Sequence, residues 1–393
     1  MKVLVCNAGS TSLKFKLFDM PAETVLAEGK IERVGSDDAI FHYQKPGCEK
    51  IYLEKQSIRR YADGIKMYLS YLTSPENGVI ADIKEVERVG FKTVLSKGYY
   101  GIHELTDDVL KGMEDYLTIA PAHNIPYLEA IRQFRDVLPD ATMIGAFETA
   151  FHTTIPLKRK MYGIPYEWYE KYGIERLGYH GASHSYVADV LTERYGSTGK
   201  TVSCHLGGSC SLCAIDNGQS MDNSFGMSLQ AGIIHANRNG DIDPFIIPFL
   251  ADEGMSMDEI TKGLTKNGGL LGISGISNDL RYIQEEAEKG NDRAQLAIDV
   301  FVEGIIRYIG SYAAEMGGLD HIAFTGGIGE HGTLVRQMVC ERLAFMGVDI
   351  DSELNEKCPG QGVISKEGSR VTVDVIAANE ELGVCRKTYN YKK

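Results

Sequence analysis

The chain opens with an apolar run that changes into an alternation of apolar and polar residues. Residues 3–6 are continuously apolar, which predicts a buried strand, and residues 13–18 alternate with a period of two, which predicts a strand with one buried face. The residues between them are mostly small and polar and include Gly9. The pattern therefore predicts a β-hairpin with a glycine- and serine-rich tip.

Nearly the same pattern returns at residues 201–218, with the sequence TVSCHLGGSCSLCAIDNG. We interpret it as an internal repeat that places one glycine-rich hairpin at the start of each of two domains. A third relative, at 321–330, is an apolar strand that ends in a glycine cluster before a predicted helix over 333–346. Strand, glycine turn and helix in this order are typical of sites that face a phosphate or a nucleotide.

Segments with a helical period lie between these strands. The amphipathic pattern predicts helices over 107–117, 125–138, 184–194, 257–264 and 292–316. Strands that alternate with helices predict an α/β fold. A length of 393 residues is enough for two domains. We place boundaries near residues 150 and 380, although no proline- or serine-rich linker marks either position.

Composition and charge narrow the classes of function. The chain is 43% hydrophobic and 24% charged, as soluble globular proteins are. Its net charge of −13 argues against nucleic acid and anionic membranes as partners, because both attract a positive surface. No leader pattern and no run of about 18 apolar residues is found, so we expect a cytoplasmic protein. Local groups must then hold any anionic substrate.

The cysteines do not indicate a disulfide-bonded or redox protein. All eight are scattered, and a chain of this size does not need disulfide bonds, so we expect reduced thiols. Cys210 and Cys213 form a C-x-x-C pair on a predicted strand, without a second pair or a histidine at zinc spacing. A metal or redox role for this pair is therefore the less favoured interpretation.

The three glycine-rich turns are candidate phosphate-binding sites. Glycine lets backbone N–H groups approach an anion closely, and serine hydroxyls donate to phosphate oxygens. An ordinary β-turn is the alternative for any single turn, but three turns of this kind at strand ends favour phosphate. None matches the GxxxxGK[ST] sequence, which argues against a Walker-type nucleotide fold.

Charged groups that a phosphate site requires lie in two further segments. The loop 237–244 combines Arg238 with two aspartates, and the planar fork of arginine can donate two hydrogen bonds to transferring phosphoryl oxygens. A solvated turn with an incidental salt bridge is the alternative. The carboxylates at 380–381 follow a predicted strand over 371–377, where they would hold Mg²⁺ through water or cap the next helix.

Two histidine-bearing segments complete the set, at residues 148–152 and 179–184. His180 and His184 are four residues apart, a spacing that zinc ligands on a helix often have. Two glycines, Gly178 and Gly181, favour a strand-to-helix turn instead. We therefore favour a neutral histidine that donates to a phosphate or carboxylate over a metal site, with a core histidine as the alternative.

In this order these segments resemble the acetate kinase family, within the superfamily that includes sugar kinases, heat-shock ATPases and actin. The resemblance covers essentially the whole chain. The matching segments are NAGSTSLK (7–14), ETAFH (148–152), YHGASH (179–184), CHLGG (204–208), RNGDIDP (238–244), GLLGIS (269–274), GGIGE (326–330) and NEEL (379–382).

The resemblance implies an α/β fold of two actin-like ATPase domains with duplicated ribonuclease H-like topology, in which mixed sheets flanked by helices close over a central cleft. The N-terminal domain would be 1–150 joined by 380–393, and the nucleotide-binding domain 151–379. The implied activity is reversible, ATP-dependent phosphorylation of a short carboxylate to an acyl phosphate, with Mg²⁺ or Mn²⁺, in a homodimer. Direct in-line transfer of this kind needs positioning and charge neutralisation more than covalent chemistry.

The resemblance also implies roles for single residues. Those that match catalytic positions are Lys92, Glu148, His180 and Arg238. Those that match positions for phosphate or substrate are Asn7, Ser10, Ser12, Lys14, His123, His205, Gly207 and Gly208. Those that match the nucleotide pocket are Asp279, Arg281, Gly327, Ile328 and Gly329. The two that match metal ligands are Asn7 and Glu380.

Departures from the family pattern are found near the acid-binding end of the site. Lys92 stands where the family has a carboxylate-binding arginine, and it supplies a point charge without a bidentate fork. Glu148 replaces an aspartate and is longer by one methylene, roughly 1.5 Å. Ala122 replaces a leucine and Tyr179 a phenylalanine, which predicts a wider and more polar pocket.

The substrate and the function class therefore have alternatives. The acceptor acid is acetate or a somewhat larger, more polar acid. A nucleotide-binding sensor that has lost catalysis is a second hypothesis, which the altered acid-binding motif supports. A kinase that uses pyrophosphate or another phosphoryl donor is a third. A chaperone or filament role is less favoured, because the ordered motif matches are with the kinases.

Overall fold

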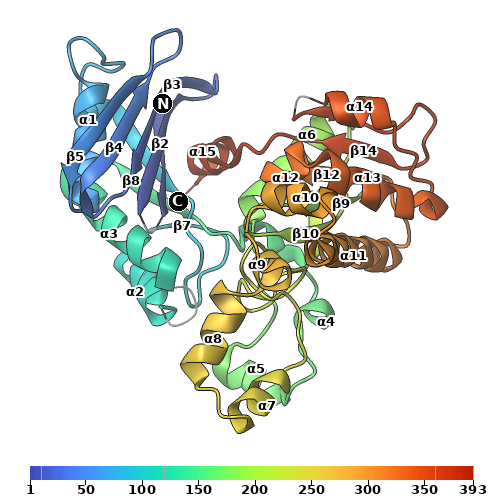
Figure 1. Ribbon diagram of the computed structural model, residues 1–393. Coiled ribbons are helices and arrows are strands. Elements are labelled where there is room, and N and C mark those ends of the chain that lie inside the picture. Colours follow the sequence, from blue (N-terminus) through green and yellow to red (C-terminus); the bar gives the residue numbers. More distant parts are fainter. Residues whose placement is uncertain (10, 118–120, 359, 393) are drawn as a thin grey trace. The chain divides into compact units, whose positions relative to one another are not determined.

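The computed structural model describes residues 1–9, 11–117, 121–358 and 360–392. The chain divides into two compact units. Unit 1 is Met1–Ala150 with Asn379–Lys393, and unit 2 is Phe151–Ala378. Both are α/β structures (Figure 1). None of the helices described is both long and apolar enough to span a membrane.

Unit 1 is built on an eight-stranded mixed sheet in the order β5-β4-β3-β2-β1-β6-β8-β7. Strands β1 to β5 form antiparallel neighbours, β1, β6 and β8 are parallel, and β7 is antiparallel to β8. The predicted N-terminal hairpin is confirmed, because β1 pairs with β2 along its whole length. The strands are β1 (Lys2–Gly9), β2 (Ser12–Asp19), β3 (Thr24–Glu32), β4 (Ser36–Gln44), β5 (Ile51–Ile58), β6 (Val86–Phe91), β7 (Ile102–Glu104) and β8 (Thr142–Ala146).

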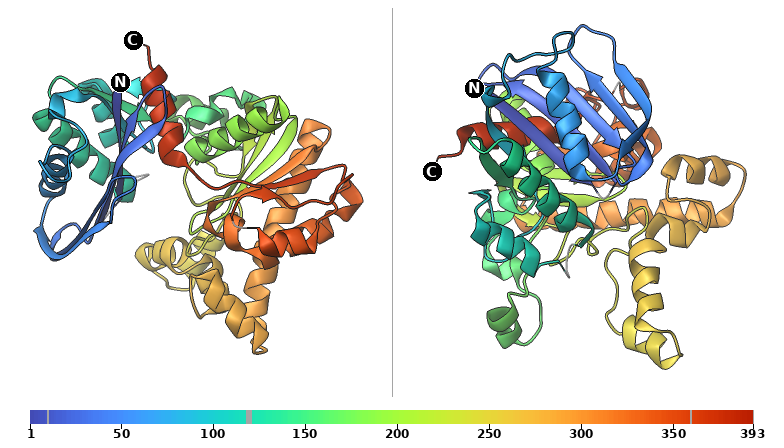
Figure 2. Two further views of the ribbon diagram at one scale, coloured as in Figure 1. Left: turned by 90° about the horizontal axis from the view of Figure 1, so that it is seen from above. Right: turned by 90° about the vertical axis from the view of Figure 1, so that its left-hand side faces the viewer.

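Helices cover both faces of this sheet (Figure 2). Phe91 packs against Phe134 of α3, with ring centroids 5.6 Å apart. The preceding residue, Gly90, faces α15, because adjacent strand residues point to opposite faces. A Cβ at Gly90 would lie 2.2 Å from Thr388 Oγ1, so glycine permits the close packing of α15. The helices are α1 (Tyr61–Leu72), α2 (Asp107–Asp115), α3 (Pro121–Val137) and α15 (Glu380–Asn390), with a 3₁₀ turn, η1, at Ile83–Glu85.

Unit 2 repeats this topology with a six-stranded sheet in the order β11-β10-β9-β12-β14-β13. In this sheet β11, β10 and β9 are antiparallel neighbours, β9, β12 and β14 are parallel neighbours, and β13 is antiparallel to β14. The strands β3-β2-β1-β6-β8-β7 of unit 1 have the same sequence of directions. The second predicted hairpin, β9 with β10, is confirmed. The strands are β9 (Lys200–His205), β10 (Ser211–Asp216), β11 (Gln219–Asn223), β12 (His321–Thr325), β13 (Gly362–Val363) and β14 (Thr372–Val375).

The core of unit 2 lies between the sheet and α11. Ile322 and Phe324 of β12 belong to the cluster that includes Phe301 of α11. Ala323, between them, packs instead against Val187 of α6, so α6 and α11 cover opposite faces. The remaining helices are α4 (Leu157–Lys160), α5 (Tyr166–Tyr172), α6 (Gly181–Tyr195), α7 (Ile246–Asp252), α8 (Met257–Lys266), α9 (Gly269–Ser274), α10 (Leu280–Glu288), α11 (Asp292–Met316), α12 (Gly326–His331), α13 (Thr333–Arg342) and α14 (Ser352–Lys357), with 3₁₀ turns η2 (Ala150–Thr154) and η3 (Ala344–Met346).

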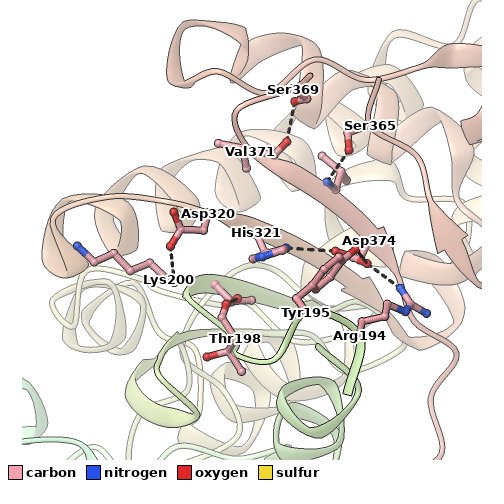
Figure 3. Close-up of polar contacts among 12 residues, drawn as sticks. Arg194, Tyr195, Thr198, Lys200, Asp320, His321, Ser365, Ser369, Val371 and Asp374 are labelled. Atoms are coloured by element: carbon pink, nitrogen blue, oxygen red, sulfur yellow. Dashed lines mark hydrogen bonds and ion pairs between the residues drawn. The ribbon is translucent and has the colours of Figure 1, made fainter. Parts of the chain in front are cut away.

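A buried carboxylate joins α6 to the sheet (Figure 3). Asp374 of β14 is fully buried. Its Oδ1 accepts from Arg194 at 2.6 Å and from the Tyr195 hydroxyl at 3.0 Å, and its Oδ2 lies 3.4 Å from Nδ1 of His321. Burial and the neighbouring Asp374 carboxylate raise the pKa of Tyr195 to about 12. The last turn of α6 is therefore held to both β12 and β14.

Two details of the predicted organisation are wrong. The second hairpin does not begin unit 2, since α4, α5 and α6 precede it. The predicted helix over 333–346 ends at Arg342 as α13, and residues 344–346 form the 3₁₀ turn η3. The glycine cluster itself is helical, as α12, because a positive φ of 77° at Gly326 turns the chain directly from β12 into a helix.

Candidate active site

In both units, candidate residues lie at the carboxyl ends of the parallel strands. In unit 1, Asn7 is near the end of β1, Lys92 follows β6, and Glu148 lies two residues beyond β8. In unit 2, His205 ends β9, and Gly327 lies just after β12. Ligands of open α/β sheets bind outside this edge of the sheet, where the loops that follow the strands converge.

Unit 1 holds a cluster of one ammonium and two carboxylate groups, Lys92, Glu148 and Glu380, which we call the acid-side cluster. Lys92 Nζ lies 2.6 Å from Glu380 Oε2 and 3.2 Å from Glu148 Oε1. Glu148 is only 4% exposed. The contact with Lys92 is an ion pair without hydrogen-bond geometry, and within the described part of the chain neither Glu148 oxygen has a hydrogen-bond partner. Glu148 therefore keeps acceptor capacity for a ligand.

Burial and charge act against each other in this cluster. Burial alone would lower the pKa of Lys92, but the carboxylates of Glu148 and Glu380 outweigh burial and hold the pKa above its ordinary value. For Glu148, burial is the largest influence and raises the pKa, while Lys92 lowers it. The lysine is therefore a fixed cation that two carboxylates share.

The N-terminal hairpin supplies the other candidates of unit 1. The Tyr127 hydroxyl donates to Asn7 Oδ1 at 2.9 Å. Ser12 and Lys14 lie on β2, opposite Gly9 and Asn7. Lys14 is exposed and lines a separate hollow of this unit together with Lys30 and Glu381. Ser10 and the side chain of His123 lie outside the described residues.

Unit 2 contains a pocket of about 610 Å³ beside its glycine-rich turns. Six residues that the sequence predicted for phosphate or nucleotide line it: Gly207, Gly208, Asp279, Arg281, Gly327 and Ile328. Gly329 does not line the pocket, since it is buried below and its N–H donates to the Leu206 carbonyl. Four polar lining side chains that the sequence reasoning missed are Asn237, Asn278, Gln284 and His331.

Asp279 and Arg281 hold each other at the wall of this pocket. Asp279 begins α10 as its N-cap and accepts from the Arg281 backbone N–H at 3.0 Å. The Arg281 guanidinium donates to both Asp279 oxygens, and these bonds lower the pKa of Asp279. Arg281 stays 83% exposed. A fixed, accessible guanidinium plane is suited to stacking on an aromatic base.

The arginine loop is anchored on the second glycine-rich hairpin. Arg238 donates to the Leu229 carbonyl at 2.5 Å and to Ser209 Oγ, and its guanidinium lies 5.9 Å from the Phe225 ring centre. Burial lowers the pKa of Arg238. Within the residues described, Arg238 has no carboxylate partner. Its charge is therefore uncompensated by an ion pair and suited to an anion.

Asp241 holds the same loop from its other side. Asp241 Oδ1 accepts from the Gly232 N–H at 2.9 Å, and Oδ2 accepts from the Tyr308 hydroxyl at 2.6 Å. The alternative interpretation of this loop was a solvated turn with an incidental salt bridge. Neither contact of Asp241 is a salt bridge, because the donors are a backbone N–H and a tyrosine hydroxyl. The aspartate is therefore a structural anchor and does not neutralise the charge of Arg238.

The histidine segments meet on the face of the sheet that α6 covers. His180 is the N-cap of α6 with a φ of 58°, so the predicted turn into a helix is confirmed. The predicted strand before it is wrong, because the residues between α5 and α6 form no strand. Its ring centre lies 4.1 Å from that of His205. His184 is buried, and burial lowers its pKa well below the ordinary value. Throughout the described ranges no group of three or more His, Cys, Asp or Glu side chains is arranged to hold a metal ion.

Comparisons with known proteins agree on one family. The sequence model of the acetokinase family matches residues 2–386. Similar curated proteins include the acetate kinase of Geobacillus kaustophilus (strain HTA426), 44% identical over 390 residues with 98% of each chain covered. Another is the acetate kinase of Bacillus subtilis (strain 168), 42% identical over 397 residues with 100% of each chain covered.

Solved structures with the same fold include two enzymes of this kind. Porphyromonas gingivalis acetate kinase has a TM-score of 0.90 at 37% identity, with 99% of this chain and 98% of that chain covered. A propionate kinase from Francisella tularensis subsp. tularensis SCHU S4 has a TM-score of 0.90 at 32% identity, with 100% of each chain covered.

Proposed function

This chain belongs to the acetokinase family, and from that premise we propose that it transfers the γ-phosphoryl group of ATP to the carboxylate of a short acid and forms an acyl phosphate. Acetate and propionate are the acids that the names of its relatives suggest. The observation that carries the proposal is the 610 Å³ pocket of unit 2, where glycine-rich turns lie beside the Asp279–Arg281 pair.

Unit 2 supplies the groups for the nucleotide. The backbone at Gly207 and Gly208 can approach phosphate oxygens closely, because it carries no side chains. Arg281 would stack on the base. Arg238 would neutralise charge on the transferring phosphoryl group, where a preorganised cation contributes most to the rate. A pocket with room for a nucleoside supports ATP as the donor over pyrophosphate.

Unit 1 supplies the groups for the acid and the metal. Lys92 would attract the carboxylate of the acid, and Glu148, whose oxygens have spare acceptor capacity, would contact its polar atoms. With Lys92 at +1 and Glu148 and Glu380 at −1 each, the cluster has a formal charge of −1. Hard oxygen donors and a negative charge fit Mg²⁺, which Glu380 and Asn7 would hold. The bound ion would neutralise phosphate oxygens.

The activity is tested directly with the full chain, ATP, Mg²⁺ and a panel of acids, with hydroxylamine to trap acyl phosphates. The panel runs from acetate and propionate to longer and hydroxylated acids, and Arg238→Ala is the inactive comparison. Acyl hydroxamate is expected with at least one acid. If no acid gives hydroxamate above the level of R238A, the proposed function is wrong.

A nucleotide-binding sensor without turnover is the second candidate. The observation that favours it is the engagement of Lys92 by two carboxylates, which competes with binding of an acid. Calorimetry on the same preparation separates the two functions. ATP binding without hydroxamate from any acid supports the sensor, and turnover with any acid removes it.

We also propose that the chain forms a homodimer through the surface of α7 and α8. These helices contact each other. Phe245, the N-cap of α7, is 76% exposed, Phe249 of α7 is 62% exposed, and Met257 of α8 is 57% exposed. Exposed apolar side chains grouped in this way mark interaction surfaces. Sedimentation analysis should give a dimer for the unmodified chain and a monomer for Phe249→Glu. A monomer in both, or a dimer in both, contradicts this interface.

A further inference from the structure

Buried serine hydroxyls link two histidines into one chain of hydrogen bonds that ends at His180. Ser211 Oγ lies 2.9 Å from Nδ1 of His180 and 2.8 Å from Nε2 of His184. Nδ1 of His184 lies 2.9 Å from Ser203 Oγ. All four side chains are buried. The order along the chain is therefore Ser203, His184, Ser211, His180.

The backbone fixes this order. Ser211 of β10 is opposite His205 of β9 in the antiparallel register, and Ser203 lies two residues before His205. The three side chains therefore share one face of the sheet. His184 lies one helical turn beyond the N-cap His180 of α6, and its backbone N–H donates to the His180 carbonyl at 2.9 Å. His184 thus contacts both serines, and His180 contacts Ser211.

The direction of donation follows from the number of hydrogens. A serine hydroxyl has one hydrogen and a neutral imidazole has one N–H. Among the described residues, the only hydrogen-bond partner of Ser203 Oγ is His184, so its hydroxyl must donate to His184 Nδ1 or stay buried and unpaired, which is unfavourable. The hydrogen of His184 is then on Nε2 and donates to Ser211. The hydroxyl of Ser211 is left to donate to Nδ1 of His180.

We propose that Ser203, His184 and Ser211 are positioning residues, which hold His180 as the neutral tautomer with its hydrogen on Nε2. His180 then presents an N–H donor to a phosphoryl oxygen without adding a charge beside the His205 ring, 4.1 Å away. This catalytic consequence rests on the proposed function, whereas the tautomer itself does not. The partner of one ring nitrogen determines where the hydrogen of a histidine lies.

The same count of hydrogen-bond hydrogens determines the tautomer of His205. Its Nδ1 lies 2.8 Å from Ser183 Oγ, which is buried and has no other hydrogen-bond partner in the described chain. The Ser183 hydroxyl therefore donates to His205 Nδ1, and the hydrogen of a neutral His205 is on Nε2. Two adjacent neutral donors avoid the repulsion that two imidazolium rings would have at this distance.

The tautomer is measured by two-bond ¹H–¹⁵N correlation spectra of the full chain labelled with ¹⁵N-histidine, without ligand and at neutral pH. The signals that disappear in His180→Asn assign the residue. His180 is expected to show a protonated Nε2 and an unprotonated Nδ1. In Ser211→Ala, mixed tautomers are expected, and kcat should fall by about tenfold while KM changes less than about twofold.

Ser203→Ala and Ser203→Thr form a matched pair. Threonine keeps the hydroxyl and should keep the His180 tautomer and kcat, whereas alanine should lose both. A hydrogen on Nδ1 of His180 in the unmodified chain, or an unchanged tautomer in both alanine variants, overturns the proposal. A chain that phosphorylates no acid but shows the Nε2 tautomer contradicts the proposed function alone.

Discussion

At the scale of single residues, the roles of the site residues depend on partners far away in the sequence. Lys92 and Glu380 are 288 residues apart, yet they form the shortest contact of the acid-side cluster. Local pattern cannot show such a contact, so only the family resemblance brought these residues together before the structure. The His180 turn is different, because Gly178 and Gly181 mark it within the local sequence.

Replacing Lys92 tests the acid-side cluster. Lys92→Met removes the ammonium group that lies beside Glu148 and Glu380, so kcat/KM for the acid should fall by roughly 100-fold or more. Binding of ATP, measured by calorimetry, should stay within about twofold, because the nucleotide pocket is formed by unit 2 alone. Lys97→Met, at an exposed position shortly after the same strand, is the control and should retain activity. Equal losses in both variants would contradict the role of Lys92.

Asp222 makes stability depend on pH. Burial and the nearby Glu315 carboxylate raise the pKa of Asp222 to about 7. Between its ordinary pKa near 4 and this value, the folded state binds more protons than the unfolded state. Its contribution to the free energy of unfolding is therefore full at low pH and is lost as the pH rises towards 7.

Asp222→Asn isolates this contribution, since an amide does not titrate. The free energy of unfolding of the variant, minus that of the unmodified chain, should increase from pH 5 to pH 8 in urea titrations. His235, whose pKa is lowered to about 3 by burial and by Arg238, acts in the opposite sense but equally in both proteins. A difference that stays flat across this range would show that Asp222 ionises normally.

At the scale of elements, prediction was reliable where local signals and burial agree. The range 292–316 was predicted correctly for α11, which has an asparagine cap at Asn291 and a left-handed Gly317 at its end. Helix α1 was missed, because Gly64 lies inside it and its N-cap, Arg60, is not a residue that favours caps. Tertiary packing of its buried residues forms this helix, and local sequence does not report that packing.

The Asp374 cluster was also missed, because its members lie on separate elements, α6, β12 and β14. Asp374→Asn should lower the free energy of unfolding by about 2 to 4 kcal/mol. This value is at the lower end for a buried ion pair, because Arg194 is partly exposed. Urea titration measures it. Asp349→Asn removes a surface pair with Lys366 and should have no measurable effect. A similar loss in both variants would show that burial of Asp374 is unimportant.

At the scale of the whole molecule, the duplication explains how much of the fold could be predicted. The two hairpins were predicted from nearly identical patterns, and both sheets repeat the same order of strands around them. The local sequence pattern does not predict where the C-terminal segment packs. Its helix α15 packs on the sheet of unit 1, and Arg88 donates to the carbonyls of Thr388, Tyr389 and Tyr391.

Deletion of residues 379–393 tests the dependence of unit 1 on this last segment. It removes the buried side chains of Val384 and Cys385 and uncovers the strand at Gly90. The free energy of unfolding of unit 1 should fall by about 3 to 6 kcal/mol. Its melting temperature should fall by on the order of 10 °C. The only tryptophan, Trp168, lies in unit 2, so its fluorescence reports that unit, whereas circular dichroism reports both.

The truncated chain should therefore show an early transition by circular dichroism that tryptophan fluorescence does not follow. Deletion of residues 392–393 alone is the control, since it leaves Arg88 and the three carbonyls in place. ATP binding by the truncated chain should persist, because the residues that line the nucleotide pocket all belong to unit 2. If both signals fall together by the same amount, the two units unfold as one, and the C-terminal helix stabilises the whole chain.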